Sequence, residues 1–204
     1  MERREIQSRS NRAIQALARR LAQSRVTPNQ ISVLSVVASL LVPLGLFGLA
    51  GIAGSVLAVA GIQLRLLANV LDGLVAVEGK KGSALGALYN EFPDRIADSV
   101  VLVSFGYFCG LGWLGWLAAL LAALTAYVRV FAGALGKKQS FRGPMAKQHR
   151  MAVVSVALLL GALAPAQYAG LLLQAALALV AAGSALTCVT RAQALAQQMT
   201  GDIP

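Results

Sequence analysis

The stretch AGSVLAVAGIQLRLLANVLDGLVAV, residues 53–77, decides how the rest of the sequence is interpreted. A helix that crosses the ~30 Å hydrocarbon core of a bilayer needs roughly 20 predominantly apolar residues, and this stretch is long enough. It nevertheless contains Arg65, Asn69 and Asp72. An ionisable residue at mid-bilayer costs at least ~2.5 kcal/mol, so such residues indicate a function or a buried partner. The stretch predicts a membrane helix with a polar site on one face.

Apolar runs of similar length follow one another along the chain. The sequence is 57% hydrophobic and only 13% charged, with a mean hydropathy of +0.69, which is far from the composition of soluble domains. The runs are rich in Ala, Leu and Gly and lack the alternation of a membrane β-barrel. We therefore expect an all-α integral membrane protein forming one domain over residues 1–204, with a six-helix bundle at 26–196. The expected spans are 29–50, 53–77, 83–109, 112–136, 146–164 and 167–191.

The basic residues predict how the bundle is oriented. The net charge is +10, and Lys and Arg lie at alternate ends of the expected spans. They cluster before Thr27, at Lys80 and Lys81, at 137–150 and at Arg191, and are absent near Gly51, Gly110 and Pro165. Cytoplasmic loops are enriched in Lys and Arg, so both termini should be cytoplasmic, most simply in a bacterial inner membrane. This explanation of the charge leaves no reason to expect a nucleic-acid partner.

The first 25 residues contain seven arginines and differ from the spans. On a helix, Ile6, Ala13, Leu17 and Leu21 would lie on one side, with Arg12 and Arg19 opposite. A basic amphipathic helix of this kind typically lies in the membrane interface, where anionic lipid headgroups attract it. Residues 1–25 are therefore predicted to form an interfacial helix.

The span expected at 83–109 carries a second set of polar residues. Asn90, Asp94 and Asp98 are successively four apart, and Asn69 and Asp72 are three apart, so each set occupies one helix face. A short loop makes the two helices antiparallel neighbours, and the two faces should converge near the cytoplasmic surface. Oxygen ligands beside a basic loop suit Mg²⁺ or Mn²⁺ holding a phosphate-containing substrate. Helix-to-helix hydrogen bonding, pairing with arginines, and an ion relay remain alternatives.

The spacing of these residues resembles the signature of the CDP-alcohol phosphotransferases, D-x-x-D-G-x-x-A-R-x8-G-x-x-x-D-x-x-x-D. The match runs from Asn69 to Asp94 and keeps every spacing. Its identical residues are Asp72, Gly73, Ala76, Gly86 and Asp94. The segment 27–32, TPNQIS, resembles the entry to the family's first span, although Thr27 followed by Pro28 is also an ordinary helix start.

Three positions depart from this signature. Asn69 and Asn90 stand where the family has metal-binding aspartates, and Val77 stands where it has arginine. An Asn oxygen can coordinate a hard cation, but the site loses two negative charges. Glu91 or Asp98, together with Lys80 and Lys81, could compensate, or the site could hold a single ion or no longer catalyse. Because Asp94 is retained, we favour a working variant.

The resemblance implies an enzyme of phospholipid synthesis. It would transfer a phosphatidyl or related group from a CDP-linked lipid, such as CDP-diacylglycerol, to a small alcohol and release CMP, working as a homodimer with one or two Mg²⁺ or Mn²⁺ ions. Asp94 would be the base, and the metal would lie on Asn69, Asp72, Asn90 and Asp94. The nucleotide would contact Gly73, Ala76, Gly86, Asn29, Lys80 and Lys81. From their positions, Arg129, Lys147, His149, Arg150 and Arg191 could form an acceptor or phosphate pocket, or they could simply be positive-inside anchors. The rival interpretations are a non-catalytic scaffold with the same fold and an ion carrier that uses the same acids.

Overall fold

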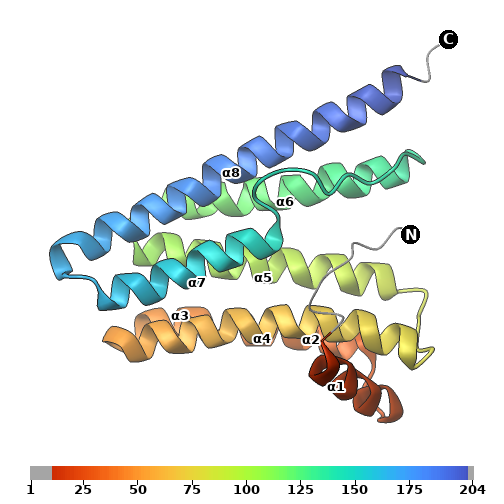
Figure 1. Cartoon of the computed structure of the whole chain (residues 1–204), viewed down its shortest axis with the longest axis horizontal. Helices are drawn as coiled ribbons and strands as arrows, with labels where there is room; N and C mark the ends of the chain where they lie inside the picture. Colours follow the sequence, from red (N-terminus) through yellow and green to blue (C-terminus); the bar gives the residue numbers. More distant parts are fainter. Residues whose placement is uncertain (1–10, 202–204) are drawn as a thin grey trace.

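The computed structural model describes residues 11–201, and this part of the chain consists of helices and short connections (Figure 1). Ile6 lies outside the described residues. The helices are α1 (Arg12–Gln23), α2 (Pro28–Ser39), α3 (Leu41–Gly48), α4 (Gly51–Glu78), α5 (Gly86–Phe108), α6 (Gly112–Ala134), α7 (Lys147–Leu163) and α8 (Ala166–Thr200). Each predicted span corresponds to one of these helices, with α2 and α3 together forming the first. The all-helical prediction is confirmed.

Four helical segments within residues 11–201 are long and apolar enough to cross a membrane: Pro28–Gly48, α4, α6 and α8. Together with their sequence they make this an integral membrane protein. The α7 helix has only 17 residues, and α5 carries four charged residues between Glu91 and Asp98. The predicted count of six spans therefore stays a prediction, as does the cytoplasmic position of the termini.

Glycine allows the helices to approach closely at the end of the bundle formed by the α3–α4 and α5–α6 connections. A Cβ added at Gly45 would lie 2.5 Å from the carbonyl oxygen of Gly54, and one at Gly106 would lie 2.5 Å from Cα of Gly115. The main hydrophobic core begins here, with buried side chains such as Val42, Leu102 and Phe105. This apolar end is held together by direct helix-to-helix contact.

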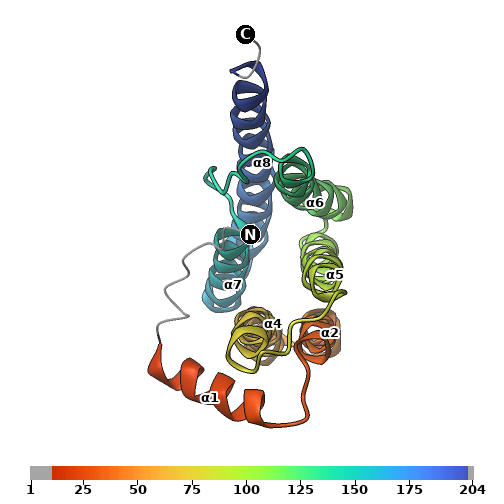
Figure 2. The ribbon, with the colours of Figure 1, turned by 90° about the vertical axis from the view of Figure 1, so that its right-hand side faces the viewer.

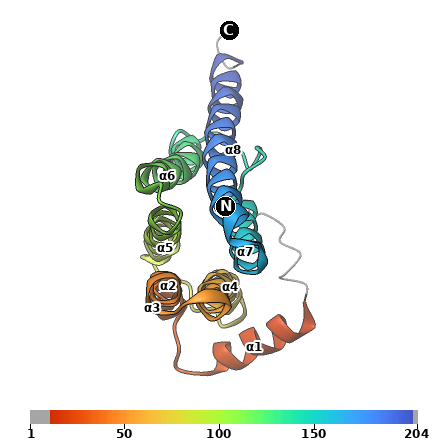
Figure 3. The same ribbon diagram turned by 90° about the vertical axis from the view of Figure 1, so that its left-hand side faces the viewer.

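The α1 helix lies crosswise to the other helices, beside α4 and α2 (Figure 2) (Figure 3). Its buried Ala18, with Ile14 and Leu21 beside it, packs against Leu71 and Val75 of α4. Leu17, which is predicted on the apolar side, is 40% exposed, while Ile14 and Ala18 face the bundle. A crosswise helix with basic residues fits the interfacial position predicted for it.

Two local features fix the chain around the opposite end of the bundle. Thr27 and Gln30 form a capping box at the start of α2, so the predicted helix start is confirmed. The connection between α6 and α7 runs along α8, where Gly143 has φ +116 and a Cβ would lie 2.5 Å from Thr187. Only glycine suits this backbone and this contact. The connection is thereby held over the space between α5, α6 and α7.

Candidate active site

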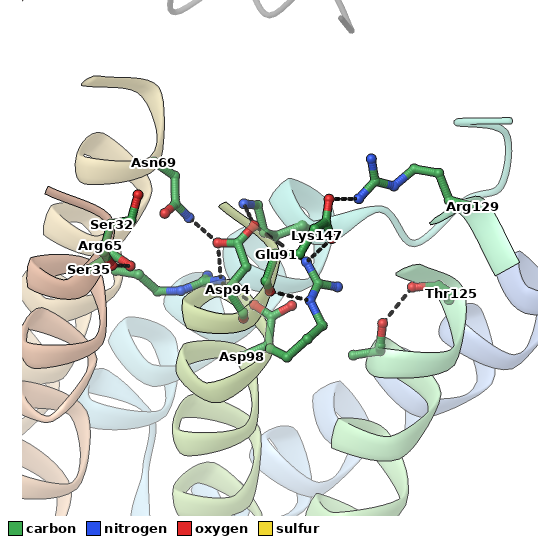
Figure 4. A network of polar contacts seen from close by, with 12 residues as sticks. Ser32, Ser35, Arg65, Asn69, Glu91, Asp94, Asp98, Thr125, Arg129 and Lys147 are labelled. Atoms are coloured by element: carbon green, nitrogen blue, oxygen red, sulfur yellow. Dashed lines mark hydrogen bonds and ion pairs between the residues drawn. The ribbon is translucent and has the colours of Figure 1, made fainter. Parts of the chain in front are cut away.

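A cavity of about 510 Å³ opens at the end of the bundle opposite the glycine contacts. It is lined by residues of α2, α4, α5, α6, α7 and α8 and of the two connections that flank α5–α6. Figure 4 shows the polar side chains that meet there. The convergence of α4 and α5 that the spacing predicts is therefore present, and four further helices contribute to the same cavity.

Most of the residues predicted for the site line this cavity. They are Asn29, Asn69, Asp72, Gly73, Ala76, Lys81, Gly86, Asn90, Glu91, Asp94, Arg129, Lys147, Arg150 and Arg191. Three do not line it. Lys80 is exposed with φ 49 in the α4–α5 connection, and His149 is exposed with its Nδ1 2.8 Å from the carbonyl oxygen of Pro144. Asp98 lies one helical turn deeper than Asp94 and is buried.

Asp72 is buried against α2. The hydroxyl of Ser32 donates to Oδ2 of Asp72 at 2.7 Å. The other oxygen, Oδ1, is buried and has no hydrogen-bond partner among residues 11–201. A buried carboxylate oxygen without a partner is costly, so a ligand in the cavity that contacted this atom would be favourable.

Asp94 is surrounded by positive charge. Its Oδ2 lies 2.6 Å from Nζ of Lys147 and 3.4 Å from Nη2 of Arg95. The amide of Asn69 donates to Oδ1 at 2.6 Å, and Nη2 of Arg65 lies 3.6 Å from the same oxygen. Both carboxylate oxygens of Asp94 are therefore engaged by groups of the chain itself.

Asp98 joins two fully buried arginines. Its Oδ1 lies 2.5 Å from Nη2 of Arg65, and its Oδ2 lies 3.1 Å from Nη2 of Arg150. Arg150 also donates to the carbonyl of Met145 at 2.9 Å. The expectation that Asp98 could replace a lost metal ligand is therefore corrected, because Asp98 does not line the cavity and its two oxygens neutralise the buried Arg65 and Arg150.

Two of the arginines predicted for an acceptor pocket are also held by groups of the chain itself. Glu91 forms an ion pair with Arg129, which in turn contacts Gln139 at 3.3 Å. Oε2 of Glu91 also lies 3.9 Å from Nη2 of Arg95. Glu91 therefore pairs with two arginines and is not available as a metal ligand. Arg191 donates to the carbonyl oxygens of Thr125 at 2.7 Å and of Arg142 at 3.0 Å, so it ties α8 to α6 and the α6–α7 connection.

Lys81 connects the rim of the cavity to the start of the bundle. Its Nζ donates to the carbonyl of Ser24 at 2.6 Å and to that of Val26 at 3.0 Å. The side chain of Asn29 contacts Ser83 beside it at 3.4 Å. Lys81 therefore links the α4–α5 connection to the α1–α2 connection. It also lines the cavity.

These residues do not fit a two-ion metal centre. Residues 11–201 contain no group of three or more His, Cys, Asp or Glu side chains that could hold a metal ion. Of the four positions predicted as ligands, two are asparagines, and the carboxylate of Asp94 already contacts Lys147 and Asn69. Divalent hard cations depend on the charge of their oxygen ligands. Only Oδ1 of Asp72 is an unused carboxylate oxygen in this set.

The alternative that the acids pair with Arg65 and Arg95 is borne out, since Arg65 contacts Asp98 and Arg95 contacts Asp94. Sequence reasoning missed two other partners: Ser32 makes the buried contact to Asp72, and Lys147 was predicted only as an acceptor contact. One signal was available for Arg65, which lies four residues before Asn69 and seven before Asp72, on the same face of α4. Ser32 and Lys147 carry no comparable signal, because their partners are 40 and 53 residues away.

The fold and the cavity define a helical membrane protein with a polar site between its helices at one end of the bundle. The family model of the CDP-alcohol phosphatidyltransferases matches residues 25–188, and the chain belongs to this family. The resemblance noted from Asn69 to Asp94 is thus confirmed. No curated protein sequence matches the chain.

Solved structures with the same fold include phosphatidylinositol phosphate synthase of Mycobacterium tuberculosis in three states. With CDP-DAG bound, it has a TM-score of 0.72 and 24% identity, covering 91% of this chain and 94% of that one. In complex with manganese and citrate, it has a TM-score of 0.71 and 23% identity, covering 89% of this chain and 88% of that one. In apo form, it has a TM-score of 0.65 and 25% identity, covering 86% of this chain and 92% of that one. Members of the family use divalent metal ions, and manganese is present in one of these structures.

Proposed function

We propose that this protein transfers a phosphatidyl or related phosphoalcohol group from a CDP-linked lipid to the hydroxyl of a small alcohol and releases CMP. The observation that carries the proposal is that the motif residues Asp72, Gly73, Ala76, Gly86 and Asp94 line one cavity together with six Lys and Arg side chains. Family membership and the likeness to a synthase solved with CDP-DAG support the choice of donor.

The charge of the cavity suits a pyrophosphate. Its wall carries three carboxylates and six cations, the latter being Lys81, Arg95, Arg129, Lys147, Arg150 and Arg191. Arginine matches phosphate oxygens with a planar fork of donors, and lysine offers a compact point charge. The start of α7 also lines the cavity, and its N-cap residue Ala146 provides no side-chain cap, so backbone N–H groups remain for an anion. These groups would hold the leaving nucleotide's negative charge.

Small residues on α4 and α5 would leave space for the nucleotide to bind. Gly73, Ala76 and Gly86 line the cavity between the two helices, and a Cβ at Gly86 would meet only the hydroxyl of Ser83 at 3.7 Å. A side chain larger than these would fill the space beside Asp72. We assign nucleotide contact to this wall, and we assign acceptor contact to the opposite wall around Arg129.

Asp94 would take the proton of the acceptor hydroxyl. A carboxylate has about four lone-pair sites, so Asp94 can accept a further hydrogen bond while it contacts Asn69 and Lys147. The hydroxyl oxygen would attack the phosphorus on the lipid side of the pyrophosphate. The bond from that phosphorus to the bridging oxygen would break, CMP would leave with that oxygen, and the proton would pass to Asp94. Holding both reactants in line supplies much of the acceleration.

The membrane setting follows the charge pattern of the connections. The cavity lies at the end where the basic connections and the crosswise α1 gather, so we place it at the cytoplasmic face of a bacterial inner membrane. A lipid donor could reach the cavity from the bilayer while the acceptor enters from water. A homodimer is proposed on family grounds alone.

CMP release tests this function. Purified protein in detergent is incubated with CDP-diacylglycerol and a panel of small alcohols, with and without Mg²⁺ or Mn²⁺, and CMP and the lipid product are measured by mass spectrometry. General-base catalysis contributes roughly 10²–10⁴-fold, so Asp94→Asn should lower the rate by about that factor. Lys138→Gln, a charge change outside the cavity lining, is the control.

The same experiment separates the rival interpretations. CDP-diacylglycerol that binds and stabilises the protein without any CMP release above the Asp94→Asn level would favour a non-catalytic scaffold. Ion flux in proteoliposomes that depends on Asp72 and Asp94 would favour an ion carrier. Either result would overturn the transferase proposal.

A further inference from the structure

The carboxylates around the cavity are balanced by cations of the chain itself. Asp94 contacts Lys147 and Arg95, and Glu91 contacts Arg129 and Arg95. Of the three carboxylates that line the cavity, Asp72 alone has no ion pair with another residue of 11–201. The hydroxyl of Ser32 donates a hydrogen bond to one of its oxygens. A divalent ion at Asp94 would have to displace a lysine at 2.6 Å.

The overall charge of the cavity also opposes a divalent ion. Its wall carries six cations and three carboxylates, and the cations remain in excess when Asp98, which pairs with Arg150 behind the wall, is counted. Like charges a few ångströms apart repel one another, so each neighbouring cation weakens binding of a further one. The asparagines at positions 69 and 90 remove the negative charge that would offset this repulsion.

The position of Lys147 is unfavourable for its own helix. It is the first residue of α7, and no acidic residue lies in that first turn. The N-terminus of a helix carries a partial positive charge, so a lysine there is destabilising unless something compensates it. Here Oδ2 of Asp94 compensates it at 2.6 Å. The stability of α7 therefore does not explain a lysine at its first position, whereas the contact with Asp94 does.

We propose that the ammonium group of Lys147 takes the place of a divalent cation beside Asp94, so that this site works without a metal ion there. The ammonium group neutralises Asp94 and has two further N–H donors for a phosphate oxygen of the substrate. Its side chain is 27% exposed, and its flexible stem allows it to follow the phosphate during transfer. The catalytic part of this inference rests on the proposed transferase function.

Manganese binding tests the inference without any need for activity. Bound Mn²⁺ is counted by electron paramagnetic resonance on purified protein in detergent. Wild type should bind Mn²⁺ weakly, and Asp94→Asn should leave that weak binding unchanged. Asn69→Asp with Asn90→Asp should restore some affinity. Adding Lys147→Gln to that pair should tighten binding by a further factor of about ten or more, since ligand charge tunes affinity.

The matched control adds Lys138→Gln to the same pair of aspartates. Lys138 lies in the α6–α7 connection outside the cavity lining, so this variant loses the same charge and should bind Mn²⁺ like the pair alone. Lys147→Met is the second variant at the central position, and size-exclusion chromatography confirms that each variant is folded. Tight Mn²⁺ binding by wild type that Asp94→Asn abolishes and Lys147→Gln leaves unchanged would overturn the inference.

Activity gives a separate readout. CMP release by wild type should survive EDTA, and Lys147→Gln should lower it more than Lys147→Arg does. Release that EDTA abolishes and Mn²⁺ restores would contradict the inference while supporting the transferase function. If no alcohol yields CMP, the proposed function fails, and the Mn²⁺ titrations alone decide whether Lys147 replaces the ion.

Discussion

The two ends of the bundle are held together in opposite ways. At the apolar end, α3 meets α4 and α5 meets α6 through glycines whose backbones are close enough to exclude any Cβ. At the other end, the helices surround a cavity of about 510 Å³, and charged side chains bridge them. The first end depends on shape, whereas the second depends on pairing charges that would be costly to bury alone. Substitutions at the two ends should therefore fail for different reasons.

The largest expected effect is the loss of the charge that joins the buried arginines. Asp98→Asn keeps the shape of the side chain but leaves Arg150 without its counter-charge and Arg65 with only the 3.6 Å contact to Asp94. Removing one member of a buried ion pair typically destabilises a protein by about 3–5 kcal/mol. Thermal unfolding in detergent should show a greatly lowered melting temperature or no folded protein. Replacing all three by apolar residues of similar size should recover much of the loss, and equal damage in the triple variant would contradict this explanation.

The next effect concerns the hydroxyl that holds Asp72. Ser32→Ala removes the 2.7 Å side-chain hydrogen bond to Oδ2 of the buried Asp72. Hydrogen bonds to charged groups contribute about 1.5–3 kcal/mol, so the melting temperature should fall clearly. The melting temperature of Ser32→Thr, which retains a hydroxyl, should fall less. A Ser32→Ala protein as stable as wild type would show that Asp72 does not depend on this contact.

At the apolar end, a single methyl group should be enough to disturb packing. Gly106→Ala would place a Cβ 2.5 Å from Cα of Gly115, so α5 and α6 must separate. Overpacking of this kind costs about 1–3 kcal/mol. Gly170→Ala in α8 is the control, since a Cβ there meets nothing within 4 Å. Both variants are compared by melting temperature, and equal values would mean that the close approach is not needed.

The two ends also differ in how far the sequence predicts them. Apolar length and helical spacing predict the helices and bring Asp72 and Asp94 to one cavity, because both patterns depend on residues near one another in the chain. Pairing across helices is a different matter. Asp98 continues the four-residue spacing of Asn90 and Asp94, yet it lies one turn too deep and neutralises Arg65 and Arg150.

The contact between Lys147 and Asp94 shows the same limit. Nothing near Lys147 in the sequence indicates that the start of α7 returns to α5, because the α6–α7 connection and α8 determine that position. The sequence shows that Asn69 and Asn90 depart from the motif, but it does not show that Lys147 lies beside Asp94 at the same site. Local spacing therefore predicts which residues can share a face, and tertiary packing decides which of them are already neutralised.

The smallest expected effect is at the rim of the cavity, and it tests whether pairing matters equally throughout the polar end. Glu91→Gln weakens the contacts to Arg129 and Arg95, but the Glu91 side chain is 27% exposed, so water can replace them. Exposed ion pairs contribute about 0.2–1 kcal/mol, and the melting temperature should change little beside Asp98→Asn. Glu78→Gln at the exposed end of α4 is the control. A loss of stability comparable to that of Asp98→Asn would show that the rim pairs, and not burial alone, hold the polar end together.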